Sequence, residues 1–282
     1  MLLPVLLGLG SGLCWGAADF VGGLQARRLP ALAVAFWSQV AGAAALALAL
    51  ALIGPPRGPL VLAWGIVAGL FGGGGLLFFY RGLAIGPMSI VAPVAACGAA
   101  VPVAAAFLLG QPPSPVALGG IGAALLGIVL VSTPGGAAGA ARGRPTGALA
   151  VALGAALCFG LFFIFLDRGA AAGGPPLWVV GGARAGSLAT IGLLAMVARR
   201  RLAWPGRRAP IVGAVGLVDT TANVLFTYAA SAGNLGVVSV LGSLYPVATV
   251  LLARLILAER LNRPQGAGVA VALTGVALMA SG

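Results

Sequence analysis

Apolar stretches of about twenty residues, the length of a membrane-spanning helix, follow one another along the whole chain. Short breaks rich in Pro, Gly and Arg separate them, and no hydrophilic stretch is long enough to fold as a soluble domain. Only 7% of the residues are charged, whereas soluble domains carry roughly a quarter. The sequence therefore predicts a multi-pass, all-α membrane protein.

Ten of these stretches are candidate transmembrane helices. They cover residues 2–24, 31–53, 60–81, 88–109, 116–132, 147–166, 177–197, 211–232, 235–257 and 265–281. No basic segment precedes the first stretch, so we interpret it as a retained helix rather than a cleaved signal peptide.

The second half of the chain repeats the pattern of the first. LCWG at 13–16 recurs as LCFG at 157–160, an offset of 144 residues. Gln39 and Arg184 each lie nine residues after a proline that precedes the second helix of a half. These matches indicate an internal duplication.

Five helices is an odd number, so two successive five-helix units point in opposite directions across a membrane. We predict two inverted five-helix repeats, residues 1–134 and 145–282, joined by a cytoplasmic linker at 135–144. Many secondary transporters have this architecture, with substrate bound near the membrane midplane between the two repeats.

The distribution of arginine predicts the orientation, because the chain contains no Lys. Only Arg57 and Arg168 follow even-numbered spans. The arginines that follow odd-numbered spans are Arg27, Arg28, Arg81, Arg142, Arg144, Arg199, Arg200, Arg201, Arg207, Arg208, Arg260 and Arg263. Cytoplasmic loops are enriched in positive residues, so the odd loops are predicted to be cytoplasmic and both termini outside. We interpret these arginines as topology signals and expect no nucleic-acid partner.

The absence of His and Lys excludes several kinds of site. It removes His-based catalytic triads, HExxH metal sites, Walker A loops and Schiff-base lysines. The three cysteines, Cys14, Cys97 and Cys158, lie in apolar segments without the spacing of metal ligands. We therefore predict that the protein is not an enzyme and holds no cofactor or metal.

The last two predicted helices carry a family pattern. SLYPVATVLLARLILAERLNRPQGAGVAVALTGVAL, residues 243–278, contains Pro246, then Glu259 thirteen residues later, then a Gly-rich helix. It resembles the end of an EamA domain of the drug/metabolite transporter superfamily, and the first half carries the pattern more weakly, with Gln111 in place of the Glu. Gln39 likewise replaces an Arg common in the family's second helix.

The resemblance implies two EamA domains and a multi-pass carrier of the bacterial inner membrane. Such carriers export or exchange amino acids, other metabolites or toxic compounds without ATP. The expected partners are a small-molecule substrate and the lipid bilayer, and the expected state is a monomer or a weak homodimer.

Two ionisable residues fall deep inside predicted spans. Asp219 lies eight residues into its span, followed one turn later by Asn223, and Arg184 lies seven residues into its own. Intramembrane charges usually face a cavity. We predict that Arg184 binds a substrate carboxylate and that Asp219 binds an ammonium group or a proton. The alternative is a structural ion pair.

Two further acidic residues have candidate roles. Asp19 is a second candidate for proton coupling, or it pairs with Arg27 or Arg28 at the membrane interface. Glu259 is a candidate cytoplasmic gate or a helix-end clamp.

Several other side chains inside the spans are candidates for substrate binding. Trp15, Trp37 and Tyr245 are able to stack on a substrate, although packing is the alternative for each, and Gln39 is a candidate polar ligand. The sequence thus favours a secondary transporter that exports or exchanges a small metabolite, with an amino acid as the favoured substrate, by alternating access. The alternatives are a multidrug or cation-efflux carrier and a structural membrane protein that transports nothing.

Overall fold

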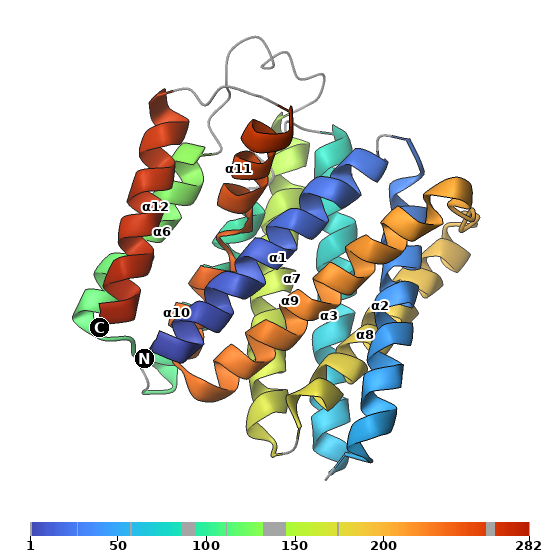
Figure 1. The fold of residues 1–282 in the computed structure, drawn as a ribbon, viewed down its shortest axis with the longest axis horizontal. Helices are drawn as coiled ribbons and strands as arrows, with labels where there is room; N and C mark the ends of the chain where they lie inside the picture. The colour runs from blue at the N-terminus through green and yellow to red at the C-terminus, as the bar shows by residue number, and fades with distance from the viewer. Residues whose placement is uncertain are drawn as a thin grey trace.

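The computed structural model describes residues 2–26, 28–56, 58–85, 94–110, 112–131, 145–173, 175–257 and 263–281, and this part of the chain is helical, without strands (Figure 1). The helices are α1 (Leu2–Ala26), α2 (Ala31–Ile53), α3 (Pro59–Ile85), η1 (Cys97–Ala99), α5 (Ala100–Leu108), α6 (Pro115–Val131), α7 (Pro145–Ala171), α8 (Pro176–Val197), η3 (Gly206–Arg208), α9 (Ala209–Ala232), α10 (Leu235–Gly242), α11 (Tyr245–Leu257) and α12 (Arg263–Ser281).

The described helices include six that are long and apolar enough to cross a membrane, and four shorter apolar helices. Large apolar side chains are exposed on the outside of the bundle, for example Leu52 and Leu108. Such a surface is stable in lipid but not in water. The prediction of an all-α, multi-pass membrane protein is confirmed, while the number of ten spans stays a prediction.

The predicted span 235–257 is not one continuous helix, because the structure divides it into α10 and α11 at Ser243 and Leu244. Pro246 has no backbone N–H, so it cannot donate to the carbonyl of Gly242 as a continuous helix requires. Proline is well tolerated in the first turn of a helix, which is its position in α11.

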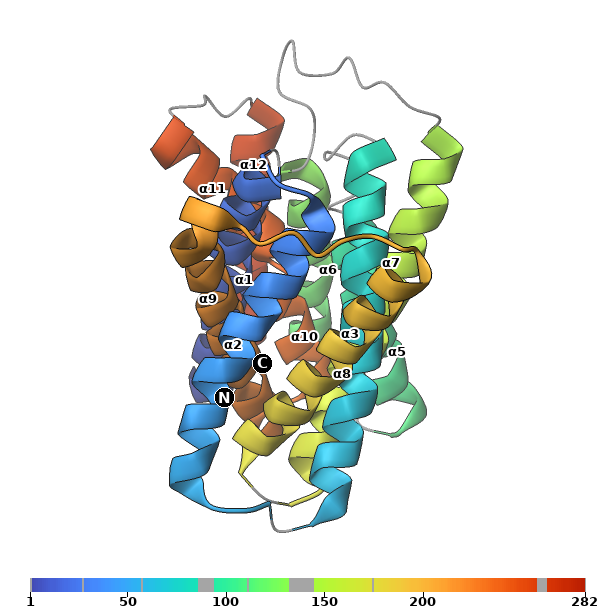
Figure 2. The ribbon, with the colours of Figure 1, turned by 90° about the vertical axis from the view of Figure 1, so that its right-hand side faces the viewer.

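The two halves are related as inverted repeats. Figures 1 and 2 show α1 and α7, the first helices of the halves, running in opposite directions. The neighbours also match, because α1 packs on α9 as α7 packs on α3, and α2 packs on α9 as α8 packs on α3. Two further contacts, α2 with α8 and α6 with α12, join equivalent helices of the two halves.

Glycine allows the crossing helices to approach until their backbones touch. A Cβ atom at Gly69 of α3 would overlap the carbonyl oxygen of Ala183 in α8. A Cβ atom at Gly216 of α9 would likewise overlap the carbonyl oxygen of Ser38 in α2. Small residues at such crossings are typical of helices packed within a membrane. These crossings hold α8 and α9 against the other repeat, and both helices carry charged residues of the site.

Candidate functional site

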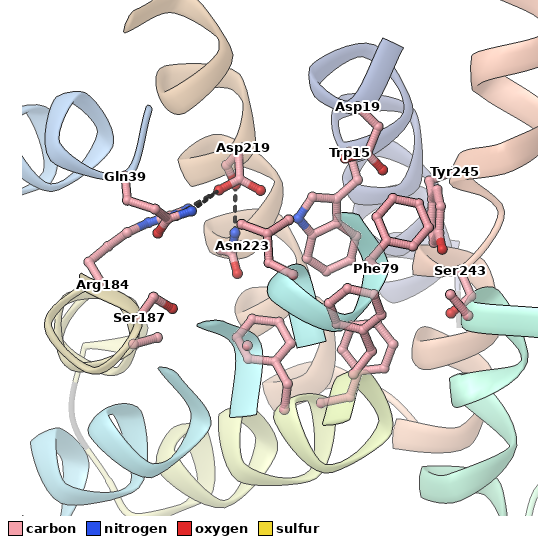
Figure 3. Close-up of a pocket in the computed structure, with 17 residues that line it drawn as sticks. Trp15, Asp19, Gln39, Phe79, Arg184, Ser187, Asp219, Asn223, Ser243 and Tyr245 are labelled. Atoms are coloured by element: carbon pink, nitrogen blue, oxygen red, sulfur yellow. Dashed lines mark hydrogen bonds and ion pairs between the residues drawn. The ribbon is translucent and has the colours of Figure 1, made fainter. Parts of the chain in front are cut away.

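A cavity of about 100 Å³ lies between the two repeats (Figure 3). Residues of α1, α2, α3, α7, α8, α9 and α11 line it. Ala95, which precedes η1, and Ser243, which lies between α10 and α11, complete the lining. The pair α6 and α12 contributes no lining residue. Three charged residues predicted to lie within the membrane line this cavity: Asp19, Arg184 and Asp219.

Arg184 is the centre of a polar network that joins three helices. Its Nη1 donates to Oε1 of Gln39 at 2.5 Å and forms an ion pair with Oδ2 of Asp219 at 2.6 Å. Nε2 of Gln39 donates to the same Asp219 oxygen at 3.3 Å. The network ties α2, α8 and α9 together and neutralises a guanidinium whose side chain is only 6% exposed.

Gln39 and Arg184 are the residues that the internal repeat matches with each other. They lie on α2 and α8, which are equivalent helices of the two halves, and their side chains meet. Their contact therefore lies where the repeats are related by their pseudo-twofold axis. The two repeats differ at this point, because the first has the neutral amide of Gln39 where the second has the guanidinium of Arg184.

The ion pair retains unused hydrogen-bonding groups. Nε and Nη2 of Arg184 are buried and have no hydrogen-bond partner among the described residues. The bonds that the described side chains make to the Asp219 carboxylate all reach Oδ2, which leaves Oδ1 without one. Nδ2 of Asn223 donates to the backbone oxygen of Asp219 at 2.6 Å, one turn earlier in α9. The pair thus offers two free donors and one free acceptor to a ligand.

Asp19 lies on α1, one turn after Trp15, and also lines the cavity. It is partly buried and forms no hydrogen bond or ion pair with the described residues, so the predicted pairing with Arg28 is not observed. Arg27 lies outside the described residues. Figure 3 shows Asp19 near Tyr245, with the Trp15 indole between it and Asp219.

Aromatic rings form much of the remaining wall. The ring of Trp15 lies 5.6 Å from that of Phe163, and the ring of Phe79 lies 6.5 Å from that of Tyr245. The sequence interpretation missed the phenylalanines, Phe79, Phe159, Phe162 and Phe163. The repeat offset of 144 residues contained the signal for one of them, since it matches Trp15 with Phe159.

Trp37 does not line the cavity. Its Nε1 donates to the carbonyl of Ala203 at 3.1 Å, and its ring packs edge-on against Trp204 at 4.7 Å. Two residues correspond to about 200° of rotation around a helix, so Trp37 cannot face inward where Gln39 does. The structure therefore brings together every described candidate for the binding site except Trp37. Glu259, the predicted gate, lies outside the described residues.

The position of Trp37 gives a direct test. We expect Trp37→Phe to leave the apparent KM for substrate within about twofold of the wild type, since neither Trp37 nor its partners Ala203 and Trp204 line the cavity. Trp15→Ala, which removes cavity wall, is expected to raise that KM. Concentration-dependent exchange in proteoliposomes measures both, and equal effects of the two substitutions would contradict this placement.

Comparison with known proteins supports one family. A model of the EamA-like transporter family matches residues 2–133 and again 146–281. Chains of solved structures match as well, 17 in number. One of them, a crystal structure of a protein, is 21% identical with a TM-score of 0.74, over 98% of this chain and 95% of its own. At that identity the likeness shows the fold alone.

No curated protein matches the sequence. The family model nevertheless matches nearly the whole chain as two successive EamA repeats. This division agrees with the matching helix contacts of the two halves. The chain therefore belongs to the EamA-like transporter family, which is part of the drug/metabolite transporter superfamily.

Proposed function

We propose that this membrane protein is a secondary carrier that exports or exchanges an amino acid through the cavity between its repeats. The observation that carries the proposal is the Arg184–Asp219 pair, with free donors on the cation and a free oxygen on the anion. In an α-amino acid, a carboxylate and an ammonium group are bonded to the same carbon atom. They are therefore close enough for the carboxylate to bind Arg184 while the ammonium group binds Asp219.

In this arrangement the substrate carboxylate accepts hydrogen bonds from Nε and Nη2 of Arg184, and the ammonium group donates to Oδ1 of Asp219. Guanidinium and carboxylate groups form strong, directional hydrogen bonds of this kind. The side chain of the substrate then extends along Trp15 and the phenylalanines.

Transport by alternating access requires that the two ends of the cavity close in turn. At one end, Leu46 and Leu50 of α2 pack on Val180 of α8, and Nε1 of Trp178 donates to the carbonyl of Gly54 at 3.0 Å. These contacts join equivalent helices of the two repeats. We propose that they form the gate on the outer side, which opens as the repeats rock against each other.

The orientation follows from the arginines. Among the exposed, described arginines, Arg81 lies near the C-terminal end of α3, and Arg28 and Arg199 to Arg201 belong to the connections that follow α1 and α8. Figure 1 shows the C-terminal ends of α1 and α3 at the end of the bundle opposite to both termini. Arg168 is in the last turn of α7, toward the other end. We propose that the arginine-rich end is cytoplasmic, in a bacterial inner membrane. The candidates for proton coupling stay Asp219 and Asp19.

Paired substrates test the proposed function. Purified protein in proteoliposomes loaded with unlabelled leucine is expected to exchange external labelled leucine, but not isopentylamine, which has the same side chain and amine without the carboxylate. Recognition of a charged group by buried donors predicts a preference of at least about 30-fold. Equal exchange of both compounds would overturn the amino-acid assignment, and efflux of a lipophilic cation such as tetraphenylphosphonium alone would favour a cation carrier.

A further inference from the structure

The charges that line the cavity do not balance. The described lining residues contribute one cation, Arg184, and two carboxylates, Asp219 and Asp19. Arg184 and Asp219 neutralise each other at 2.6 Å. An ionised Asp19 leaves one negative charge inside the membrane without a cation, where an unpaired ion is strongly destabilising, so a proton or a second cation must neutralise it.

A neutral amino acid does not correct this imbalance. Its carboxylate and ammonium groups are both used by the Arg184–Asp219 pair, and the carboxylate of Asp19 stays without a cation. The repeat offset of 144 residues matches Asp19 with Phe163, so the acidic group has no counterpart in the second half. Asp19 is thus an addition to the symmetric scaffold, and it lies away from the ion pair, on the other side of the Trp15 ring (Figure 3).

We propose that the substrate is an amino acid with a positively charged side chain, a diamino or guanidino acid, and that Asp19 binds the distal cation. This inference rests on the proposed function, because it uses the Arg184–Asp219 pair for the α-carboxylate and α-ammonium groups. The substrate brings a net charge of +1 to a site of net charge −1, so the occupied cavity is neutral. Neither half of the substrate is left without an ionic partner.

The surroundings of Asp19 suit a cation on a flexible apolar stem. Trp15, one turn away on α1, lines the same cavity, and an indole ring attracts both methylene groups and cations. Tyr245 and Ser243, which also line this end, supply hydroxyl oxygens. No described arginine other than Arg184 lines the cavity, so nothing there repels a second cation.

Lysine and Nε-acetyllysine test this assignment, because they share a carbon chain and differ in the distal charge. Wild-type proteoliposomes are expected to exchange lysine at least about 30-fold better than Nε-acetyllysine or leucine. Asp19→Asn is expected to reverse this preference, by lowering exchange of lysine and leaving or raising that of the two neutral amino acids. Asp19→Glu keeps the charge and is expected to keep the preference for lysine.

The outcomes separate the two levels of the proposal. Exchange of leucine and Nε-acetyllysine at the rate of lysine, with no change of ratio in Asp19→Asn, would overturn the cationic substrate but leave an amino-acid carrier. Failure of all three amino acids in the wild type would overturn the proposed function itself. A melting temperature of Asp19→Asn in detergent equal to or above that of the wild type shows that its altered ratio does not arise from unfolding.

Discussion

Arg184→Gln is expected to abolish amino-acid exchange and to lower the melting temperature of the carrier. The substitution removes the donors Nε and Nη2, which are proposed to hold the substrate carboxylate, and it leaves Asp219 without its cation. Breaking a buried ion pair costs about 3–5 kcal/mol, and the 23% exposure of the Asp219 side chain places the loss at the low end. The initial rate of exchange in proteoliposomes should fall by at least about 100-fold, because the site loses hydrogen bonds to a charged group.

Two further variants separate binding from stability. Arg184→Gln combined with Asp219→Asn removes both charges, so it is expected to regain much of the lost melting temperature without regaining exchange. Arg184→Lys keeps the ion pair with Asp219 but lacks the fork of donors, so its stability should lie near that of the wild type while its exchange is lowered. Exchange at the wild-type rate by the double variant would show that the pair is structural only.

The sequence was enough to predict that Arg184 and Asp219 either face a cavity or pair with each other. Both are charged residues placed well inside apolar spans, and the free energy of an unpaired charge in a bilayer leaves few arrangements other than mutual contact or a cavity. The structure shows both, since the residues pair and line a cavity. The repeat also predicted that Gln39 and Arg184 are equivalent, but not that they meet, because the meeting of equivalent residues depends on the position of the symmetry axis.

Other parts of the site depend on information that lies outside any local pattern. Trp37 and Trp15 look alike in the sequence as aromatic residues in apolar helices, and only the rotation of each helix about its axis distinguishes them. In a helix that is apolar on all sides, hydrophobic periodicity does not report that rotation. The phenylalanines of α7 were missed for the same reason, because in a membrane protein Phe is as common on a lipid-facing surface as inside.

The break between α10 and α11 was within reach of the sequence. Pro246 lies inside the predicted span 235–257, but a proline inside a membrane helix bends it in some proteins and interrupts it in others. Here the interruption places Ser243 and Tyr245 at the cavity. The tertiary environment that satisfies the freed backbone groups decides between the two outcomes.

Gly69→Ala is expected to destabilise the protein and to reduce transport. The added Cβ atom would overlap the carbonyl oxygen of Ala183 and lie 2.8 Å from the backbone nitrogen of Ser187, so α8 must move away from α3. The hydrogen bond of 3.0 Å from Oγ of Ser187 to the carbonyl of Gly69 would be strained as well. Ala183 directly precedes Arg184, and this displacement therefore moves the guanidinium. Overpacking of this kind costs about 1–3 kcal/mol, and a shift of about 1 Å at a positioned group is enough to reduce activity about 100-fold.

Gly74→Ala on the same helix is the matched control. The nearest atom to its added Cβ would be Sγ of Cys158 at 3.9 Å, an ordinary van der Waals contact. Alanine has a higher intrinsic helix propensity than glycine, by about 0.8–1 kcal/mol in model helices, so any change in stability should be neutral or favourable. Melting temperatures in detergent and lysine exchange in proteoliposomes should therefore separate the two alanine variants clearly. If Gly69→Ala melted and exchanged substrate like Gly74→Ala, the backbones of α3 and α8 would have to lie farther apart than in this structure, and Arg184 would not be held in place by that crossing.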